Sequence, residues 1–152
     1  MSTPEAKLAE MGLAVPEVAK PVASYVPAVR SGSHVFTSGQ LPMREGELIA
    51  TGKVGGSVTT EVALECARQC ALNALAAVRA EVGELSAVKR IVKVVVFVAS
   101  TPDFTGQPGV ANGVSELFGE AFGESGRHAR SAVGVSVLPL DAPVEVELVV
   151  EV

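Results

Sequence analysis

The sequence predicts an α+β fold of the order β-β-α-β-α-β-β, with two helices packed on one face of a sheet. Segments near both ends of the chain alternate between apolar and polar residues, which is typical of half-buried strands. Two internal segments repeat apolar residues at steps of three and four, which is typical of helices. Between them, residues 91–99 are nearly continuously apolar and β-branched, as in a strand covered on both faces.

The length and composition are those of one domain. A chain of 152 residues that is 48% hydrophobic can bury one core, but it is too short for two ordinary domains. We therefore expect residues 1–152 to form a single domain, with residues 1–22 as a peripheral N-terminal helix and linker. Thr3 followed by Pro4 predicts the start of that helix, which should run to about Met11.

The first two strands should form a hairpin. Residues 25–30 and 34–41 are joined by Ser31-Gly32-Ser33, a sequence typical of a turn. Residues 43–57 are rich in glycine and charge, so we expect an irregular loop there, with at most a short strand at 48–50.

Two helices flank the apolar strand. Thr59 or Thr60 is expected to cap the first, which should run from residue 61 to about residue 82 with its apolar side on the sheet. The polar residues on its opposite side are Glu61, Glu65, Gln69 and Asn73. The second helix should run from Val110 or Asn112 to Phe122, and the strand at 91–99 should form the middle of the sheet.

The last quarter of the chain predicts a second hairpin, made by residues 129–139 and 144–147. One face of its first strand is small and carries a single charge: Arg130, Ala132, Gly134 and Ser136. Small side chains permit close approach, so we expect a partner to cover this face. Alternation places Glu145 on the same face, but pairing Val137 with Val144 would separate it from Arg130 by roughly 20 Å. A ligand shared by both would then need a pocket between subunits, or splayed strands.

Arg130 is the first candidate for a binding residue. Its planar guanidinium suits a carboxylate, which it can hold through two hydrogen bonds where water is scarce. The alternative is an ion pair with an acidic residue of a neighbouring subunit, and the residues alone favour this structural role.

The charge of the chain argues against nucleic-acid binding. A net charge of −5 and a pI near 5.1 are unsuited to a phosphate backbone, which needs clustered Lys and Arg. No signal-peptide pattern or bilayer-length apolar run is present, so we expect a cytoplasmic protein with no membrane partner. Cys66 and Cys70 lie four residues apart in a helical segment, far in sequence from His34 and His128. We expect reduced, buried cysteines and no metal site.

Three separated motifs carry a family resemblance. The first is Tyr25 followed by Thr37-Ser38-Gly39-Gln40, and the second is Asn112 before Glu116-Leu117-Phe118. The third is Ala129-Arg130-Ser131 with Leu138-Pro139 and Val144-Glu145-Val146. With these residues at this spacing, the chain resembles the RidA/YjgF family over nearly all of its length beyond about residue 22. It departs from the family at Val146, where Ile or Met is usual, and Asn112 matches if one residue is inserted before Arg130.

The resemblance implies a chorismate-mutase-like α+β fold and a homotrimer whose sheets pack inward. It also implies pockets between subunits and hydrolysis of reactive 2-imino or 2-enamino acids to 2-oxo acids and ammonia. No metal or organic cofactor is required for this reaction. The implied partners are therefore a small carboxylate-bearing substrate and two further copies of the chain.

The family's site residues have counterparts here. By this resemblance, Arg130 would bind the substrate carboxylate, while Ser38 and the Gly39 backbone would help to hold the ligand. Glu145 would position or deprotonate the attacking water. Tyr25 and Asn112 would line the cleft.

Each of these residues also has a structural alternative. Tyr25 and Asn112 are equally typical of packing or capping, and Ser38 of the turn before Gly39. Glu145 lies near other carboxylates and is also compatible with a solvated strand edge. His128, two residues before Arg130, is more typical of a surface or interface residue, and we leave it outside the predicted site.

Two other functions compete with imine hydrolysis. Many members of the family carry a cysteine two residues after the arginine, where this chain has Ala132. That departure favours a non-catalytic trimer that binds small carboxylates as a sensor or regulator. The family is also labelled endoribonuclease, which ranks last because the chain is acidic and only 4% aromatic.

Overall fold

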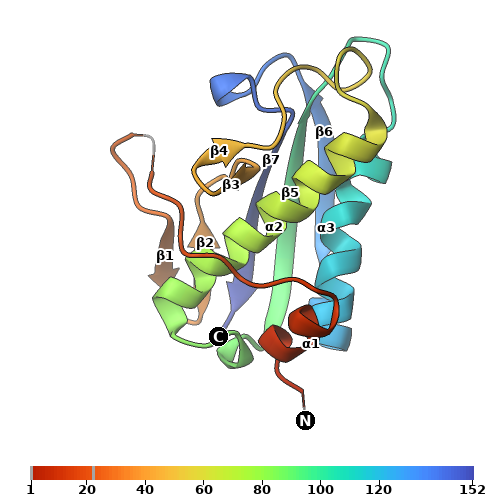
Figure 1. Ribbon diagram of the computed structural model, residues 1–152. Helices are drawn as coiled ribbons and strands as arrows, with labels where there is room; N and C mark the ends of the chain where they lie inside the picture. The colour runs from red at the N-terminus through yellow and green to blue at the C-terminus, as the bar shows by residue number, and fades with distance from the viewer. Residues whose placement is uncertain (1, 22) are drawn as a thin grey trace.

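A five-stranded sheet with helices on one face forms the body of the molecule (Figure 1). The computed structural model describes residues 2–21 and 23–152. The helices are α1 (Pro4–Glu10), α2 (Thr60–Val82) and α3 (Gln107–Phe122). The strands of the sheet are β1 (Ala28–Ser31), β2 (His34–Thr37), β5 (Arg90–Ala99), β6 (Ala129–Val135) and β7 (Val144–Glu151). A separate small hairpin comprises β3 (Met43–Arg44) and β4 (Glu47–Leu48), with Glu45 and Gly46 at positive φ in the tight turn between them. The α+β class and the order of the main elements are as predicted.

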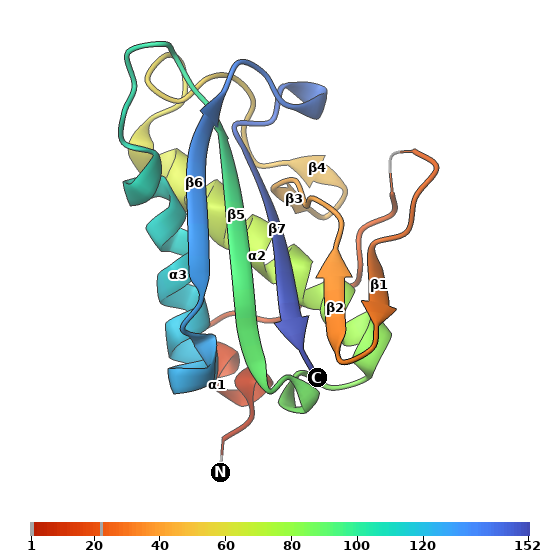
Figure 2. The same ribbon diagram turned by 180° about the vertical axis from the view of Figure 1, so that it is seen from behind.

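The strand order, β1-β2-β7-β5-β6, corrects the predicted C-terminal hairpin. Strands β6 and β7 exist, but β5 lies between them, parallel to β6 and antiparallel to β7 (Figure 2). A parallel pair needs a crossover, and α3 provides it between β5 and β6. Alternation identifies a strand but not its neighbour, and the irregular connection at 136–143 is longer than a tight hairpin turn. The predicted pairing of Val137 with Val144 is therefore wrong.

The two faces of the sheet differ in what covers them. Val94, Val96 and Val98 of β5 are fully buried on the face under α2 and α3. On the opposite face, Phe97 is only half-buried and Val133 is 43% exposed. Figure 2 shows this second face without helices. The sheet therefore has one face within the core and one apolar face uncovered in the single chain.

The small face of β6 is turned toward the chain's own helix α3, which leaves Arg130 and Ala132 half-buried and Gly134 exposed. The expectation that a partner covers this face stays a prediction. Arg130 and Ala132 stand beside Val94 and Val96 of β5, which places them on the helix side. At Gly134 a Cβ atom would lie 2.8 Å from Nε2 of Gln107, at the start of α3. Glu145 stands beside Phe97 on the uncovered face. Arg130 and Glu145 therefore lie on opposite faces of the sheet, against the prediction that they share one.

Helix α2 begins with Thr59, whose Oγ1 accepts a hydrogen bond from Val62 N (3.2 Å). Gln69 and Asn73 were expected on the side away from the core, but they are 8% and 3% exposed. The β3–β4 hairpin covers them, because Asn73 Nδ2 donates to Leu41 O and to a second carbonyl of this segment. Such paired amide groups are buried at little cost.

Helix α3 begins at Gln107, three residues before the earliest predicted start at Val110. Pro108 occupies its first turn, where the missing N–H costs no helical hydrogen bond. This earlier start places the Gln107 side chain beside Gly134, which remains exposed.

The N-terminal segment is tied to the domain at three points. Thr3 Oγ1 caps α1 as predicted, and Leu8 is fully buried in the core. Glu5 Oε1 accepts from Leu85 N (2.9 Å), and the Arg79 guanidinium donates to Val15 O (3.2 Å). Residues 16–21 then run across the helix side of the sheet toward β1 (Figure 1).

Cys66 and Cys70 are buried and not disulfide-bonded, as predicted. Burial raises the pKa of the Cys66 thiol to about 11 and that of Cys70 well above its ordinary value. Both thiols are therefore protonated and unreactive at neutral pH. Within residues 2–21 and 23–152, no helix is long and apolar enough to cross a lipid bilayer.

Candidate functional site

Apart from Tyr25, the predicted site residues fall into two groups on opposite faces of the sheet. Ser38, Gly39 and Glu145 form the Glu145 group, at the end of β2 and on the uncovered face of β7. Asn112, Ser115, His128 and Arg130 form the Arg130 group, between α3 and β6.

The Glu145 group is built by a close approach of two backbones. Gln40 N donates to Val146 O (2.7 Å) and Val146 N donates to Gln40 O (3.0 Å), which presses the segment after β2 onto β7. A Cβ atom at position 39 would lie 2.6 Å from Oε1 of Glu145 and 2.7 Å from its Cδ. Only glycine therefore leaves room for the carboxylate in this position.

The surroundings of Glu145 disfavour its charged form. Burial raises the pKa of its carboxyl above the ordinary value, and the charge of Glu147 raises it further. A raised pKa brings a carboxyl group nearer to the pH range in which it serves as general base and then as acid.

The Ser38 side chain is engaged in the fold. Its Oγ donates to Val26 O (2.6 Å) and its backbone N donates to Pro27 O (2.8 Å), which fastens the segment before β1. The hydroxyl hydrogen is thus committed, and the oxygen lone pairs are left to accept a hydrogen bond from a ligand.

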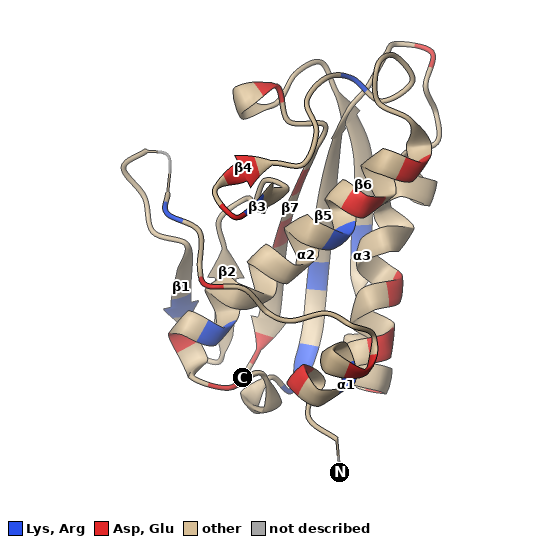
Figure 3. Cartoon of the chain, viewed as in Figure 1, with Lys and Arg blue, Asp and Glu red and all other residues tan. Residues whose placement is uncertain are grey.

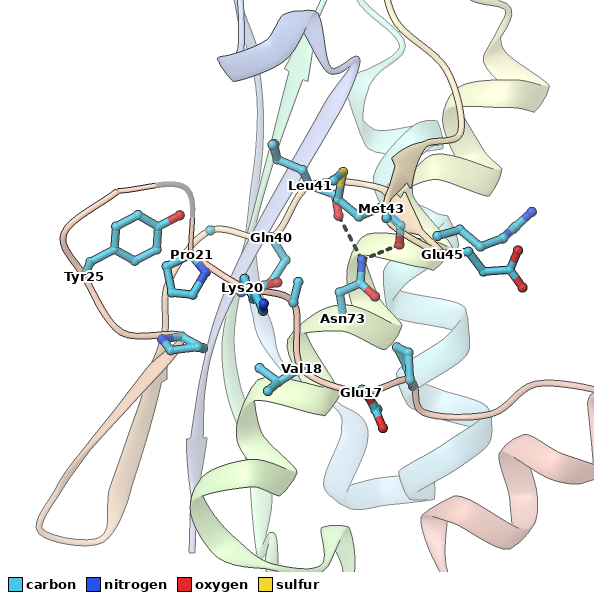
Figure 4. A pocket seen from close by; sticks show the side chains of 16 residues that line it. Glu17, Val18, Lys20, Pro21, Tyr25, Gln40, Leu41, Met43, Glu45 and Asn73 are labelled. Carbon is cyan, nitrogen blue, oxygen red and sulfur yellow. Dashed lines mark hydrogen bonds between the residues drawn. The ribbon is translucent and has the colours of Figure 1, made fainter.

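A pocket of about 570 Å³ brings Tyr25 and Gly39 together on the helix side of the sheet. Figure 4 shows Tyr25 and Pro21 along one wall and Asn73 beneath Leu41 and Met43 along the other. The sequence analysis missed this pocket, because it placed the linker outside the site and Asn73 toward solvent. An amide among the apolar residues 71–78 of the long helix was the signal available.

The Arg130 group brings two predicted residues together. Arg130 Nη1 donates to Asn112 Oδ1 (2.9 Å) and to Ser115 Oγ (3.1 Å) from adjacent turns of α3. Both hydrogens of Nη1 are thus used. Among the described residues, Arg130 makes no other hydrogen bond and lies within ion-pair distance of no carboxylate. Its Nε–H and Nη2–H groups are therefore available to an anion.

Ser115 and His128 are residues of this group that the sequence analysis did not include. Ser115 Oγ lies 2.9 Å from His128 Nε2, and His128 Nδ1 lies 2.6 Å from Gly126 O. Burial lowers the pKa of His128, against the effect of the Gly126 hydrogen bond, and the Arg130 charge lowers it further. The spacing of His128 from Arg130 was visible in the sequence, whereas the serine on α3 could be linked to it only in three dimensions.

The two groups cannot meet within one chain. Arg130 pairs with Val94 and Glu145 with Phe97, so the two are offset by roughly 10 Å along β5 and by about another 10 Å across it. Their side chains also point to opposite faces. A small ligand that contacts both needs a second copy of the chain, or a rearrangement of this one.

Comparison with known proteins identifies relatives along the whole chain. Residues 5–152 match the YjgF/chorismate mutase-like family, to which an endoribonuclease activity has been ascribed. Protein TCP17 of Trypanosoma cruzi is 46% identical over 147 residues, which covers 96% of this chain and 92% of that protein. The 2-iminobutanoate/2-iminopropanoate deaminase of Dermatophagoides farinae is 32% identical over 140 residues, with 91% and 93% covered.

Solved structures agree with these matches. A protein of unknown function from Agrobacterium tumefaciens is 43% identical, with a TM-score of 0.92 over 99% of this chain and 92% of that one. E. coli TdcF, solved with bound serine, is 27% identical, with a TM-score of 0.67 over 90% of this chain and 94% of that one.

Proposed function

This chain belongs to the YjgF/chorismate mutase-like family, and on that premise we propose that it hydrolyses 2-imino or 2-enamino acids to 2-oxo acids and ammonia. The observation that carries the proposal is Arg130. Its guanidinium donates to the uncharged oxygens of Asn112 and Ser115 and has no carboxylate partner among the described residues. Its Nε–H and Nη2–H groups can therefore donate to an anion. A relative named 2-iminobutanoate/2-iminopropanoate deaminase and a related structure with bound serine support a small amino-acid-like ligand.

The site residues have complementary roles in this reaction. Arg130 binds the substrate carboxylate, and the Gly39 backbone and the Ser38 oxygen help to hold the molecule beside Glu145. The carboxylate of Glu145 takes a proton from water while the water oxygen bonds to the imine carbon. The C=N electron pair moves to nitrogen, and Glu145 passes the proton to that nitrogen, which gives a carbinolamine. Glu145 then takes the hydroxyl proton as the C=O bond forms and transfers it to the nitrogen as the C–N bond breaks, so that ammonia leaves with both protons of the water and the 2-oxo acid remains.

The proposed site lies between subunits of a homotrimer. The Glu145 group faces the uncovered side of the sheet, and that side exposes large apolar residues that a second copy would bury. These residues are Val29, Phe36 and Val133. In the proposed trimer, the uncovered face of one chain lies against the β6 edge of its neighbour's sheet. This would bring the Glu145 group of one chain toward the Arg130 group of the next, with Tyr25 and Asn112 beside the cleft.

A non-catalytic carboxylate-binding trimer is the second candidate. Ala132 supports it, because the side chain two residues after Arg130 has no group able to donate, accept or attack. Arg130 would bind a 2-oxo acid in the same way, without hydrolysis. Figure 3 gives no support to RNA binding, since Lys and Arg are interspersed with Asp and Glu over the part of the chain it shows.

A coupled assay tests the proposal. An amino-acid oxidase or a pyridoxal-phosphate dehydratase would generate imines, and release of 2-oxo acid would be followed with wild type, Arg130→Ala and Glu145→Gln. Arg30→Ala and Glu151→Gln are matched controls. Arg30 is an exposed arginine on β1 whose Nε donates to Gly32 O, and Glu151 lies at the far end of β7 from Glu145. We expect acceleration by wild type and by the controls, and a loss of about 100-fold or more in the other two.

Other outcomes separate the two candidates. If intact wild-type trimer accelerates none of the imines, hydrolysis is excluded. Calorimetric titration with 2-oxo acids would then show whether Arg130 binds carboxylates, and binding lost in Arg130→Ala would establish the second candidate.

A further inference from the structure

A chain of hydrogen bonds runs from Arg130 past α3 to the backbone of Gly126. It passes from Arg130 Nη1 to Ser115 Oγ (3.1 Å), from there to His128 Nε2 (2.9 Å), and from His128 Nδ1 to Gly126 O (2.6 Å). The His128 ring also packs edge-to-face on Phe118, with centroids 5.9 Å apart. Ser115 and His128 therefore belong to the surroundings of the arginine, although the proposed reaction gives them no role.

The direction of each bond in this chain follows from the chemistry of its atoms. A carbonyl oxygen only accepts, so Nδ1 of His128 carries the hydrogen in its bond to Gly126. In a neutral imidazole ring Nε2 then carries no hydrogen, so its lone pair accepts a hydrogen bond from the Ser115 hydroxyl. The lone pairs of Ser115 are thereby turned toward Arg130, which donates to one of them.

This arrangement determines the plane of the guanidinium. One Nη1 hydrogen goes to Asn112 Oδ1 and the other to Ser115 Oγ, and two such bonds from one nitrogen orient the whole planar group. The Nη2 and Nε edges that would hold a carboxylate are then aimed in one direction before a ligand arrives. Preorganisation of this kind raises affinity, because the side chain loses less freedom on binding.

We propose that Ser115 and His128 are positioning residues, which hold Arg130 in the orientation that binds the substrate carboxylate. This inference rests on the proposed function of Arg130 and extends it to two residues that contact no substrate. His128 acts only through Ser115, and it does so as neutral imidazole with the hydrogen on Nδ1.

The charges around His128 are consistent with a neutral ring. Arg130 acts on it from its own strand, and a pocket of about 390 Å³ beside it is lined by Arg90, Arg127 and Glu124. Glu124 is paired with the Arg127 guanidinium (3.3 Å) and lies at the surface. Arg90 Nη2 donates to Arg127 O (3.3 Å), which keeps a second cation on this side of the ring.

Four variants test the proposal through steady-state kinetics on imines. Ser115→Ala removes one of the two acceptors of Arg130 Nη1. His128→Phe keeps the contact with Phe118 but removes the acceptor of the Ser115 hydroxyl. For both we expect KM to rise about tenfold, with kcat within twofold of wild type, because carboxylate binding is weakened in ground state and transition state alike. Ser115→Thr and His128→Gln keep a hydroxyl and an acceptor, and we expect their KM to remain within about twofold of wild type.

A matched control and a spectroscopic measurement distinguish positioning from general damage to the fold. Ser125→Ala removes a hydroxyl that donates to Phe122 O at the C-terminal end of α3. The KM of this variant should equal that of wild type. The imidazole ¹⁵N shifts of wild type should show a neutral ring protonated on Nδ1 at pH 7.5, and Ser115→Ala should shift the Nε2 resonance.

The results separate this inference from the proposed function. Wild-type turnover with unchanged KM in Ser115→Ala and His128→Phe would overturn the positioning role alone, as would a ring protonated on Nε2. Wild type that neither hydrolyses imines nor binds 2-oxo acids would overturn the proposed function, and with it the purpose assigned to these residues. A raised KM in both truncated variants, with recovery in Ser115→Thr and His128→Gln, would establish the role.

Discussion

At the scale of single residues, the contact between Gly39 and Glu145 separates function from stability. Gly39 does not have a positive φ, so an alanine can adopt its backbone conformation without strain. Its Cβ would instead fall 2.6 Å from Oε1 of Glu145, the far end of a flexible side chain that can swing away. The fold can therefore accept the change, whereas the carboxylate cannot keep its place.

We predict that Gly39→Ala lowers imine turnover by about 100-fold, because a displaced carboxylate no longer reaches the attacking water. The free energy of unfolding should change by less than about 1 kcal/mol. The measurements are the coupled assay and thermal unfolding. Gly119→Ala is the control, since a Cβ there meets nothing within 4 Å, and it should remain fully active. Full activity of Gly39→Ala would contradict the assigned place of Glu145.

Glu145 also makes stability depend on pH. Its pKa is raised in the folded state, so the folded chain holds this proton to a higher pH than the unfolded chain does. The stabilisation is complete below the ordinary carboxyl pKa and is lost as the pH rises through the folded value. At neutral pH and above, the ionised carboxylate therefore opposes folding.

We predict that Glu145→Gln is more stable than wild type at pH 8, by up to about 1 kcal/mol because the group is half-exposed and screened by water. At pH 4 the two proteins should be nearly equal. Melting temperatures of both proteins at the two pH values test this. A variant that is less stable at pH 8 would show that the ionised carboxylate has a favourable partner.

At the scale of elements, Asn73 joins α2 to the β3–β4 hairpin. Its Nδ2 donates to Leu41 O and Met43 O, both at 2.9 Å, and Gln69 Nε2 donates to its Oδ1 (3.1 Å). Arg44 Nε in turn donates to Gln69 Oε1 (3.3 Å). This network supplements the apolar packing of the hairpin, whose Met43 and Leu48 lie against a small buried cluster that includes Ala99 and Leu138. It also forms one wall of the larger pocket.

We predict that Asn73→Ala costs about 2–3 kcal/mol of stability, because two carbonyls lose their donor in a buried place. Hydrogen exchange should become faster in residues 41–48 while β5 stays protected. If residues 41–48 exchange hydrogen at the same rate in Asn73→Ala and in wild type, the β3–β4 hairpin does not depend on Asn73 for its stability.

At the scale of the whole molecule, the uncovered apolar face is the strongest argument for self-association. Val133 is 43% exposed and lies beside Phe97, while Phe36 on the adjoining part of the sheet is 47% exposed. Exposed apolar residues gathered on one face are typical of interfaces. Because Arg130 and Glu145 lie on opposite faces, a second copy is also the simplest way for one ligand to contact both without rearrangement of the chain.

We predict that Val133→Lys converts a trimer, of three times the chain mass of 15.5 kDa, into monomers. Imine turnover should be lost with it, while circular dichroism shows an unchanged fold. Val62→Lys is the matched control, because Val62 is 38% exposed on the helix side. Sedimentation velocity is the measurement, and a wild-type monomer would overturn the inter-subunit site.

The sequence by itself determined the elements, because helices and strands leave their periods in the order of residues. A cap at Thr59 or Thr60 and the strands around Arg130 and Glu145 follow from local alternation and spacing. The residues also carried the family resemblance, since its motifs are short and lie within single elements.

Only the tertiary structure decided which strands are neighbours. Strand β5 lies between β6 and β7, and this moves Arg130 to the face under α3, away from Glu145. It also decided that Asn73 is buried, that Ser115 meets His128, and that Gly39 touches Glu145. These facts depend on contacts between residues distant along the chain, and the period of one segment carries no information about the partner it packs against.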